Sequence, residues 1–427
     1  MPPVLGLDVT AYPDFCCCCG GIVTITRLSE KAATYLGRLC LDYPHRRVGS
    51  RGNRAATDFF AQVVASFGFE TECPEFECID WTQDGALLTI EGEPFEVLVS
   101  PYSLGGQARA PLVVVSTMEE LEAVETSKKI LLMRGDLARE QLMPKNFPFY
   151  NPDRHQRIIH LLEKKKPRAI VAATSRNPEL AGGVYPFPLI EDGDFDIPSV
   201  YMTEEEGHRL AKHEGREVSL VIKAERLPAQ GNNVIARKGS ASGPRVVLCA
   251  HIDSKEDTPG AVDNASGVVV LLLLAELLVD YSGDLGVEIV AFNGEDYYSA
   301  PGQVLYLRDN ADRLSEVVLA INIDVAGYHE GNTAYSLYDC PEEIAASIRK
   351  VFSAVEDSVE GERWYQSDHS IFIQNGVPAL AMTSDRFMEL STCVTHTPQD
   401  SPEIVDCTRL AKMALALRDL VLDLNRH

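Results

Sequence analysis

Residues 246–279 read VVLCAHIDSKEDTPGAVDNASGVVVLLLLAELLV, an apolar strand-like run followed by a polar loop and an apolar run of helical length. The second apolar run is interrupted by Glu276 and is too short to span a bilayer, so it predicts a buried helix. Three more apolar runs, with helical segments between them, lie at 287–296, 317–327 and 377–384. Apolar strands separated by helices are typical of a parallel sheet that is covered on both faces. We therefore predict an α/β fold with a mostly parallel central sheet flanked by helices.

The chain before residue 246 divides into a helical part and a β-rich part. Apolar residues recur at helical spacing between a predicted cap at Asn53 and an end at Gly68, and 29–41 predicts a preceding helix. Short β-rich runs lie at 111–115, 129–133, 169–174 and 198–202. We predict three parts: a disordered extension over 1–28, a main domain from 29–84 and 213–427, and a smaller β-rich inserted domain over 85–212.

Composition limits the classes of partner and the compartment. At roughly 150 residues per domain, 427 residues predict two to three domains. The formal net charge of −24 disfavours nucleic acid and membrane surfaces as partners, because both are anionic. The eleven cysteines include four in a row, Cys16 to Cys19, and do not form a disulfide framework. No secretory signal is visible, so we expect a cytoplasmic protein, and homo-oligomerisation stays open.

Ionisable side chains stand where the predicted strands end. In open α/β sheets, ligands bind beyond the carboxyl ends of the strands, and these ends meet at one edge. Taken singly, each residue has an ordinary explanation; Asp263, for example, would cap the apolar helix. Together, two imidazoles and five carboxylates at one edge predict a metal site. These residues are His251, Asp253, Asp263, Glu295, Asp296, Asp324 and His396.

This mixture of side chains suits two divalent metal ions. Imidazole and carboxylate are ligands that zinc accepts, and several acids offset the charge of two ions. A carboxylate has two oxygens, so it can bridge both ions, which lower the pKa of a water between them. Another carboxylate must stay uncoordinated to accept the proton of that water. We therefore predict two divalent ions, most plausibly zinc.

Six segments resemble a known family, the dinuclear zinc exopeptidases related to aminopeptidase Y and glutamate carboxypeptidase. They are HIDS at 251–254, PGAVDNASG at 259–267, NGED at 293–296, NID at 322–324, SDHSIFIQNGVPA at 367–379 and THTPQD at 395–400. The resemblance covers most of residues 29–427 and includes the twelve-residue step from His251 to Asp263. The middle region resembles the protease-associated domain that is often inserted in such enzymes, which implies a lid or a substrate-selecting wall beside the metals.

The resemblance implies a ligand set. Asp263 would bridge both metals. His251 and Asp324 would complete the protein ligands of one metal, and Asp296 and His396 those of the other. One departure affects the second metal: family members commonly have glutamate where this chain has Asp296, whose side chain is one methylene shorter.

The resemblance also implies the catalytic roles. Glu295 would be the general base that returns the proton to the leaving amine, and Asp253 would orient His251. Several family members have a tyrosine before the last histidine, where it stabilises the oxyanion, but this chain has Thr395. The candidates to replace it are Tyr297, Tyr298, Tyr328 and Tyr365.

The expected function is that of a zinc aminopeptidase, which removes the N-terminal residue of a peptide through a metal-bridging hydroxide. Three alternatives stay open: a carboxypeptidase or dipeptidase, a glutaminyl-cyclase-like acyltransferase with one zinc, and a non-catalytic binding protein. An acidic group near the metals would select an amine and an arginine would select a carboxylate, but the sequence assigns neither. No G-x-S-x-G elbow occurs, which disfavours a serine hydrolase.

Overall fold

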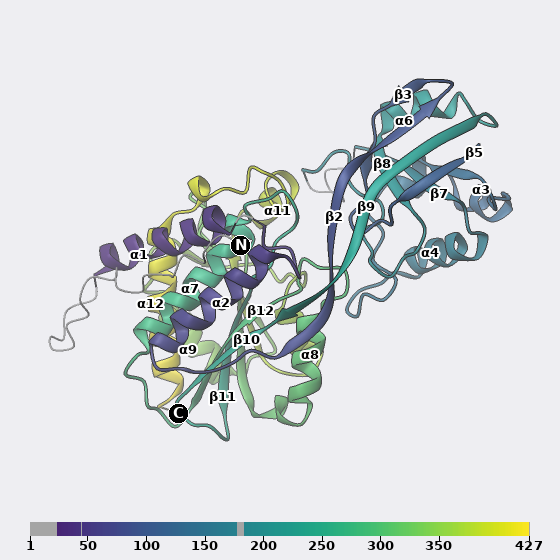
Figure 1. The fold of residues 1–427 in the computed structure, drawn as a ribbon. Coiled ribbons are helices and arrows are strands. Elements are labelled where there is room, and N and C mark those ends of the chain that lie inside the picture. The colour runs from purple at the N-terminus through teal and green to yellow at the C-terminus, as the bar shows by residue number, and fades with distance from the viewer. Residues whose placement is uncertain (1–23, 44, 177–182, 427) are drawn as a thin grey trace, which may run out of the picture.

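The computed structural model describes residues 24–43, 45–176 and 183–426, which form two eight-stranded mixed sheets with helices packed around them (Figure 1). Cys16 to Cys19, and the predicted extension up to residue 23, lie outside the described residues.

The first sheet carries the predicted apolar strands. Its strand order is β1 (Glu70–Glu72), β10 (Val234–Lys238), β12 (Gly286–Phe292), β11 (Arg245–His251), β13 (Val317–Ile323), β16 (Ala379–Ser384), β14 (Thr333–Tyr338) and β15 (Ser358–Glu360). The four central strands, β12, β11, β13 and β16, are parallel, as predicted. However, β10 and β14 pair antiparallel with the two outer members of this group. The sheet is therefore mixed: β10, β14 and β15 run against the central four strands, whereas β1 runs in the same direction as they do.

Both faces of the central strands are buried. Along β11, Val246, Leu248 and Ala250 belong to one hydrophobic core, whereas Val247 and Cys249 belong to another, because successive strand residues point to opposite faces. The first core is covered by α1 (Ile25–Gly37), α2 (Arg51–Ser66), α7 (Ser266–Leu277), α9 (Glu342–Phe352) and α12 (Cys407–Leu424). The second is covered by α8 (Pro301–Asn310) and α10 (His369–Ile373).

The N-terminal helices differ from the prediction at their starts. Helix α1 begins at Ile25 rather than at 29, because the Thr24 hydroxyl accepts a hydrogen bond from the Arg27 amide. Helix α2 is capped by Ser50 rather than Asn53. The Asn53 side chain instead exchanges hydrogen bonds with Asn293, in the segment that leads to Glu295 and Asp296. Ser50, three residues before the predicted cap, is therefore the residue that marks the start of the helix.

The second sheet has the order β3 (Glu93–Phe95), β2 (Glu75–Ile90), β9 (Glu217–Asn232), β5 (Gly106–Val115), β6 (Ile130–Met133), β7 (Ala169–Thr174), β8 (Ser199–Thr203) and β4 (Leu98–Val99). All four β-rich runs of the middle region form strands, as predicted. Helices α3 (Met118–Ala123), α4 (Asp153–Lys165) and α6 (Glu204–Ala211) lie in the same region.

Strands β2 and β9 connect the two sheets. They pair antiparallel from Glu75 opposite Asn232 to Thr89 opposite Ser219, and Figure 1 shows this long ribbon running from one half of the molecule into the other. The predicted boundary between residues 84 and 85 falls inside β2. The division into a main and an inserted domain stays a prediction.

Helix α7 confirms the buried helix that the sequence predicts, since residues 266–275 are all buried. Within the three described ranges, no helix combines the length and the apolar character that crossing a membrane requires.

Candidate metal centre

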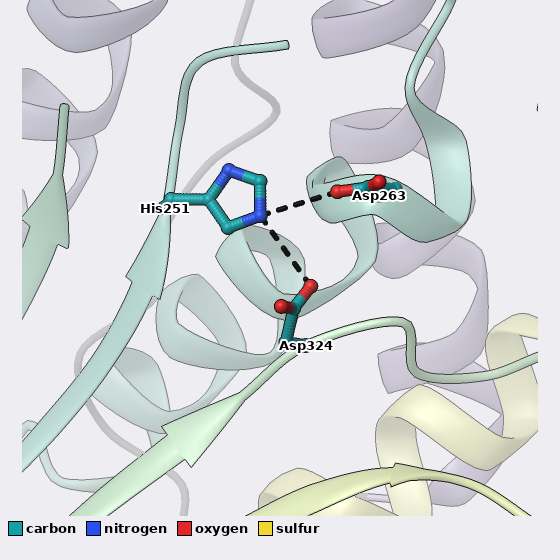
Figure 2. A group of neighbouring side chains, drawn as sticks. All are labelled: His251, Asp263 and Asp324. Atoms are coloured by element: carbon teal, nitrogen blue, oxygen red, sulfur yellow. Dashed lines mark ion pairs between the residues drawn. The ribbon is translucent and has the colours of Figure 1, made fainter. Parts of the chain in front are cut away.

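The carboxyl ends of neighbouring parallel strands bring the first three residues together. His251 is the last residue of β11, and Asp324 directly follows β13, its parallel neighbour. Nε2 of His251 lies 3.4 Å from Oδ1 of Asp324 and 3.2 Å from Oδ1 of Asp263. Figure 2 shows the imidazole facing both carboxylates. Asp263 reaches them from the segment Ala261–Ala265, which leads into α7 and in which Asp263 itself has non-helical backbone angles.

A second group of three shares Asp263 with the first. Oδ2 of Asp263 lies 3.2 Å from Nε2 of His396, and this same nitrogen lies 3.1 Å from Oδ1 of Asp296. In each group, one ligand atom from every residue lies within 4.8 Å of those of the other two. The structure therefore brings all five predicted ligands into two clusters joined by the two oxygens of one carboxylate.

The geometry fits metal ions. Two ligands about 2.1 Å from one tetrahedral ion lie about 3.4 Å apart, which matches the contacts of 3.1 to 3.4 Å. Nε2 of His251, Oδ1 of Asp324 and Oδ2 of Asp296 are buried and have no hydrogen-bond partner among the described residues. A buried polar atom without a partner is costly, and a bound cation would satisfy all three.

The charges of the two clusters reinforce each other. Burial lowers the pKa of His251, but the nearby carboxylates of Asp324 and Asp263 outweigh it and raise the pKa well above its usual value. The pKa of His396 is raised in the same way, by Asp296 and Asp263 against burial. Burial raises the pKa of Asp263, but its contacts with both imidazoles lower it more strongly. Excess negative charge at the centre therefore attracts cations, whether protons or metal ions.

Glu295 stands beside the clusters without belonging to either. Burial raises its pKa well above the usual value; His251 lowers it, and the carboxylates of Asp296 and Asp324 raise it further. A carboxylate with a raised pKa that is not needed as a ligand can accept a proton.

The carboxylate of Asp253 has different partners from those predicted. Its oxygens accept hydrogen bonds from three consecutive backbone amides, those of Gly294 (2.8 Å), Glu295 (3.3 Å) and Asp296 (3.0 Å). Nδ1 of His251 instead lies 3.2 Å from the backbone oxygen of Asp253 and 3.8 Å from its carboxylate. The side chain of Asp253 therefore fixes the loop that carries Glu295 and Asp296, and its backbone oxygen faces the imidazole.

Sequence reasoning missed two residues that position the ligands. Asp400 is fully buried, and its oxygens accept hydrogen bonds from the amides of Val262 (2.7 Å) and Asp263 (3.1 Å). The only signal was its place at the end of the THTPQD segment.

The second missed residue is Arg46, which is 1% exposed. Its guanidinium donates to the carbonyl oxygens of Ile252, Pro259 and Gly260, and to that of Leu39. It thereby holds both ends of the loop between His251 and Asp263. The sequence around it, HRRVGS, indicated only a turn.

Three of the tyrosines that could replace the oxyanion-stabilising tyrosine have other neighbours in the structure. The Tyr297 hydroxyl donates to the backbone oxygen of Ile79 and accepts from its amide, so β2 occupies it. The side chain of Tyr365 is 54% exposed and packs against Tyr338. Tyr298 packs against Tyr102 and Tyr297.

Comparison with known proteins supports this centre. Residues 233–421 match Peptidase family M28, and all five clustered residues lie within this segment. A probable lipoprotein aminopeptidase of Mycobacterium tuberculosis is 24% identical over 75% of this chain and 62% of its own length. A probable leucine aminopeptidase 2 of Aspergillus fumigatus is 25% identical over 79% of this chain and 68% of its own. The chain thus spans about two thirds of the length of these relatives.

Solved structures share the fold. An aminopeptidase from Aneurinibacillus sp. strain AM-1 superposes with a TM-score of 0.71, at 23% identity over 93% of this chain and 94% of its own. A zinc aminopeptidase from Bacillus subtilis gives a TM-score of 0.72, at 20% identity and the same coverage. The likeness covers both sheets, so the whole described architecture is that of these α/β proteins.

Proposed function

We propose that this chain, whose residues 233–421 form a peptidase domain of family M28, is a metal-dependent aminopeptidase. One observation carries the proposal: two clusters of metal-ligand type share Asp263, and Glu295 stands beside them as an unused carboxylate. This is the arrangement needed to hold two ions and to move one proton. The relatives support the reaction class, since their names describe aminopeptidases, one of them containing zinc.

Each cluster would hold one ion, with Asp263 contributing to both. Two ions bound there would lower the pKa of a water and polarise the scissile carbonyl. Glu295 accepts the proton of the attacking water at its carboxylate and later gives it to the leaving amine. Asp253 holds the backbone of the loop that carries Glu295, so the proton acceptor keeps a fixed position.

The proposed substrate is a peptide with a free N-terminus. The test compares three forms of one peptide, Leu-Gly-Gly: unblocked, N-acetylated and C-terminally amidated. We expect release of leucine from the first and third forms and no cleavage of the second. Cleavage that survives acetylation but stops on amidation would contradict the proposal and favour a carboxypeptidase. Cleavage of Leu-Gly but of no longer peptide would favour a dipeptidase.

We also propose that the middle region acts as a protease-associated-like wall beside the metal centre. The contacts of its residues 183–193 with Tyr298, Lys255 and Cys393, which lie close in sequence to residues of the centre, support this role.

A further inference from the structure

One segment of the middle region, residues 183–193, lies against three loops that carry metal-centre residues. Gly183 packs against the backbone of Cys393, which lies three residues before His396. A Cβ added to Gly183 would lie only 3.0 Å from Cα of Cys393. At the other end, a Cβ on Gly193 would lie 2.4 Å from the ring of Tyr298, two residues after Asp296. The segment therefore spans the edge of the sheet where both clusters lie.

Between these two contacts, the segment forms an ion pair with the third loop. Nζ of Lys255 lies 2.9 Å from Oε1 of Glu191, and the amide of Gln141 donates to Oε2 of the same carboxylate at 3.0 Å. The side chains of Glu191 and Lys255 are only 10% and 24% exposed. Lys255 stands four residues after His251, in the loop that leads to Asp263.

The charge of Lys255 is held by the surrounding acids. Burial lowers its pKa, but Glu191, Asp296 and Glu295 raise it above the usual value. Lysine has three N–H donors, and Glu191 uses one of them. The pair thus links residues 183–193 to the loop between His251 and Asp263.

We propose that Glu191 and Lys255 determine the charge that the enzyme accepts on the first side chain of its substrate. This inference rests on the proposed aminopeptidase function and adds the substrate class: peptides whose N-terminal residue has an uncharged side chain. The two charges cancel each other, so the wall attracts neither acidic nor basic side chains. A charged side chain would lose water there without gaining a partner, which costs free energy.

If the pair determines the accepted charge, removing one partner should shift substrate preference toward acidic side chains and removing the other should shift it toward basic ones. A purely structural contact predicts no such opposite shifts. Glu191→Gln keeps the size of the side chain and removes the carboxylate that pairs directly with Lys255, so the wall becomes more positive. Lys255→Met removes the ammonium and leaves Glu191 unneutralised, so the wall becomes negative. An uncompensated charge in a partly buried site attracts the opposite charge strongly.

The experiment measures kcat/KM for the p-nitroanilides of leucine, glutamate and lysine, which lack a second residue. For Glu191→Gln, we expect the glutamate-to-leucine ratio to rise about tenfold. For Lys255→Met, we expect the lysine-to-leucine ratio to rise by about the same factor. The reversed pair, Glu191→Lys with Lys255→Glu, restores the preference for leucine. Thermal unfolding checks that each variant is folded.

Glu163→Gln is the matched control, because Glu163 also pairs with a lysine of the middle region, Lys145 at 2.7 Å, and lies outside residues 183–193. It leaves both ratios unchanged. The proposal is overturned if either single variant scales all three substrates by one factor, or if the control shifts the ratios as Glu191→Gln does. A wild-type protein that binds zinc but cleaves none of the three would instead refute the aminopeptidase function itself.

Discussion

Nε2 of His251 lies 3.2 Å from Oδ1 of Asp263, whose other oxygen faces His396 at the same distance. One carboxylate therefore belongs to both clusters, and its orientation is fixed from two sides. An ion bound in either cluster would orient Asp263 for the other, which would couple the two sites.

The first prediction concerns the base. Glu295→Gln keeps the shape of the side chain but cannot accept a proton, so we expect kcat to fall by about 10²- to 10⁴-fold while zinc content stays the same. Steady-state kinetics and metal analysis on one sample check this. Glu356→Gln, at a side chain 86% exposed, is the control. A fully active, folded Glu295→Gln protein would contradict the assignment.

The second prediction concerns the protons that zinc displaces from His251 and His396. Since nearby carboxylates raise the pKa of both His251 and His396, the imidazoles of the metal-free protein keep their protons to higher pH than a free histidine does. Zinc must displace these protons, so its apparent affinity rises with pH until the raised pKa values are passed. Calorimetric titration in two buffers of different ionisation enthalpy measures the release of about two protons per protein. Heats that do not depend on the buffer would refute this.

The third prediction concerns Asp400. Burial and the charge of Asp263 raise its pKa to about 7, while its hydrogen bonds to Val262 and Asp263 oppose this rise. Asp400→Asn keeps the volume but offers an N–H to one of the two amides, so Asp263 loses part of its support. We expect zinc affinity to fall about 10- to 100-fold with the fold intact. Competition with a chromogenic chelator measures it, and the exposed Asp419→Asn serves as the comparison. Equal affinities of wild type and Asp400→Asn would show that Asp400 does not position the ligand.

The fourth prediction concerns Arg46. Arg46→Met leaves four carbonyl oxygens in a buried region without their donor, so we expect a loss of about 3 kcal/mol in the free energy of unfolding. Urea denaturation of the metal-free protein measures it. Arg109→Met, at a side chain 75% exposed, should change stability by under about 1 kcal/mol. A similar loss in both variants would mean that the buried carbonyls do not need Arg46.

Much of the centre was predictable, because strand ends can be recognised from sequence. Two apolar runs, one ending at His251 and one ending just before Asp324, predicted two parallel strands, and these strands are neighbours in the structure. The imidazole and the carboxylate at their ends predicted a shared metal site, and the two side chains do lie in contact. The antiparallel strands β10 and β14 were not predicted, because their short runs lack the helices that mark parallel connections.

The residues that support the centre were harder to predict. Arg46 acts on carbonyl oxygens more than 200 positions away, and backbone acceptors leave no trace in a sequence. Glu191 lies in a loop of the second sheet and Lys255 in a loop of the first. No local sequence pattern indicates that two such residues form an ion pair. The cytoplasmic location and homo-oligomerisation stay predictions.

The number of zinc ions that sustain activity tests the central claim most directly. Metal-depleted protein is titrated with zinc while the release of leucine from Leu-Gly-Gly is measured, and native mass spectrometry counts the bound ions at each point. We expect no activity without metal, a maximum at two ions per chain, and only one tightly bound ion in His396→Ala, which retains the cluster of His251, Asp263 and Asp324. Full activity in the metal-free protein, or a wild type that binds a single ion at saturation, would contradict a dinuclear centre bridged by Asp263.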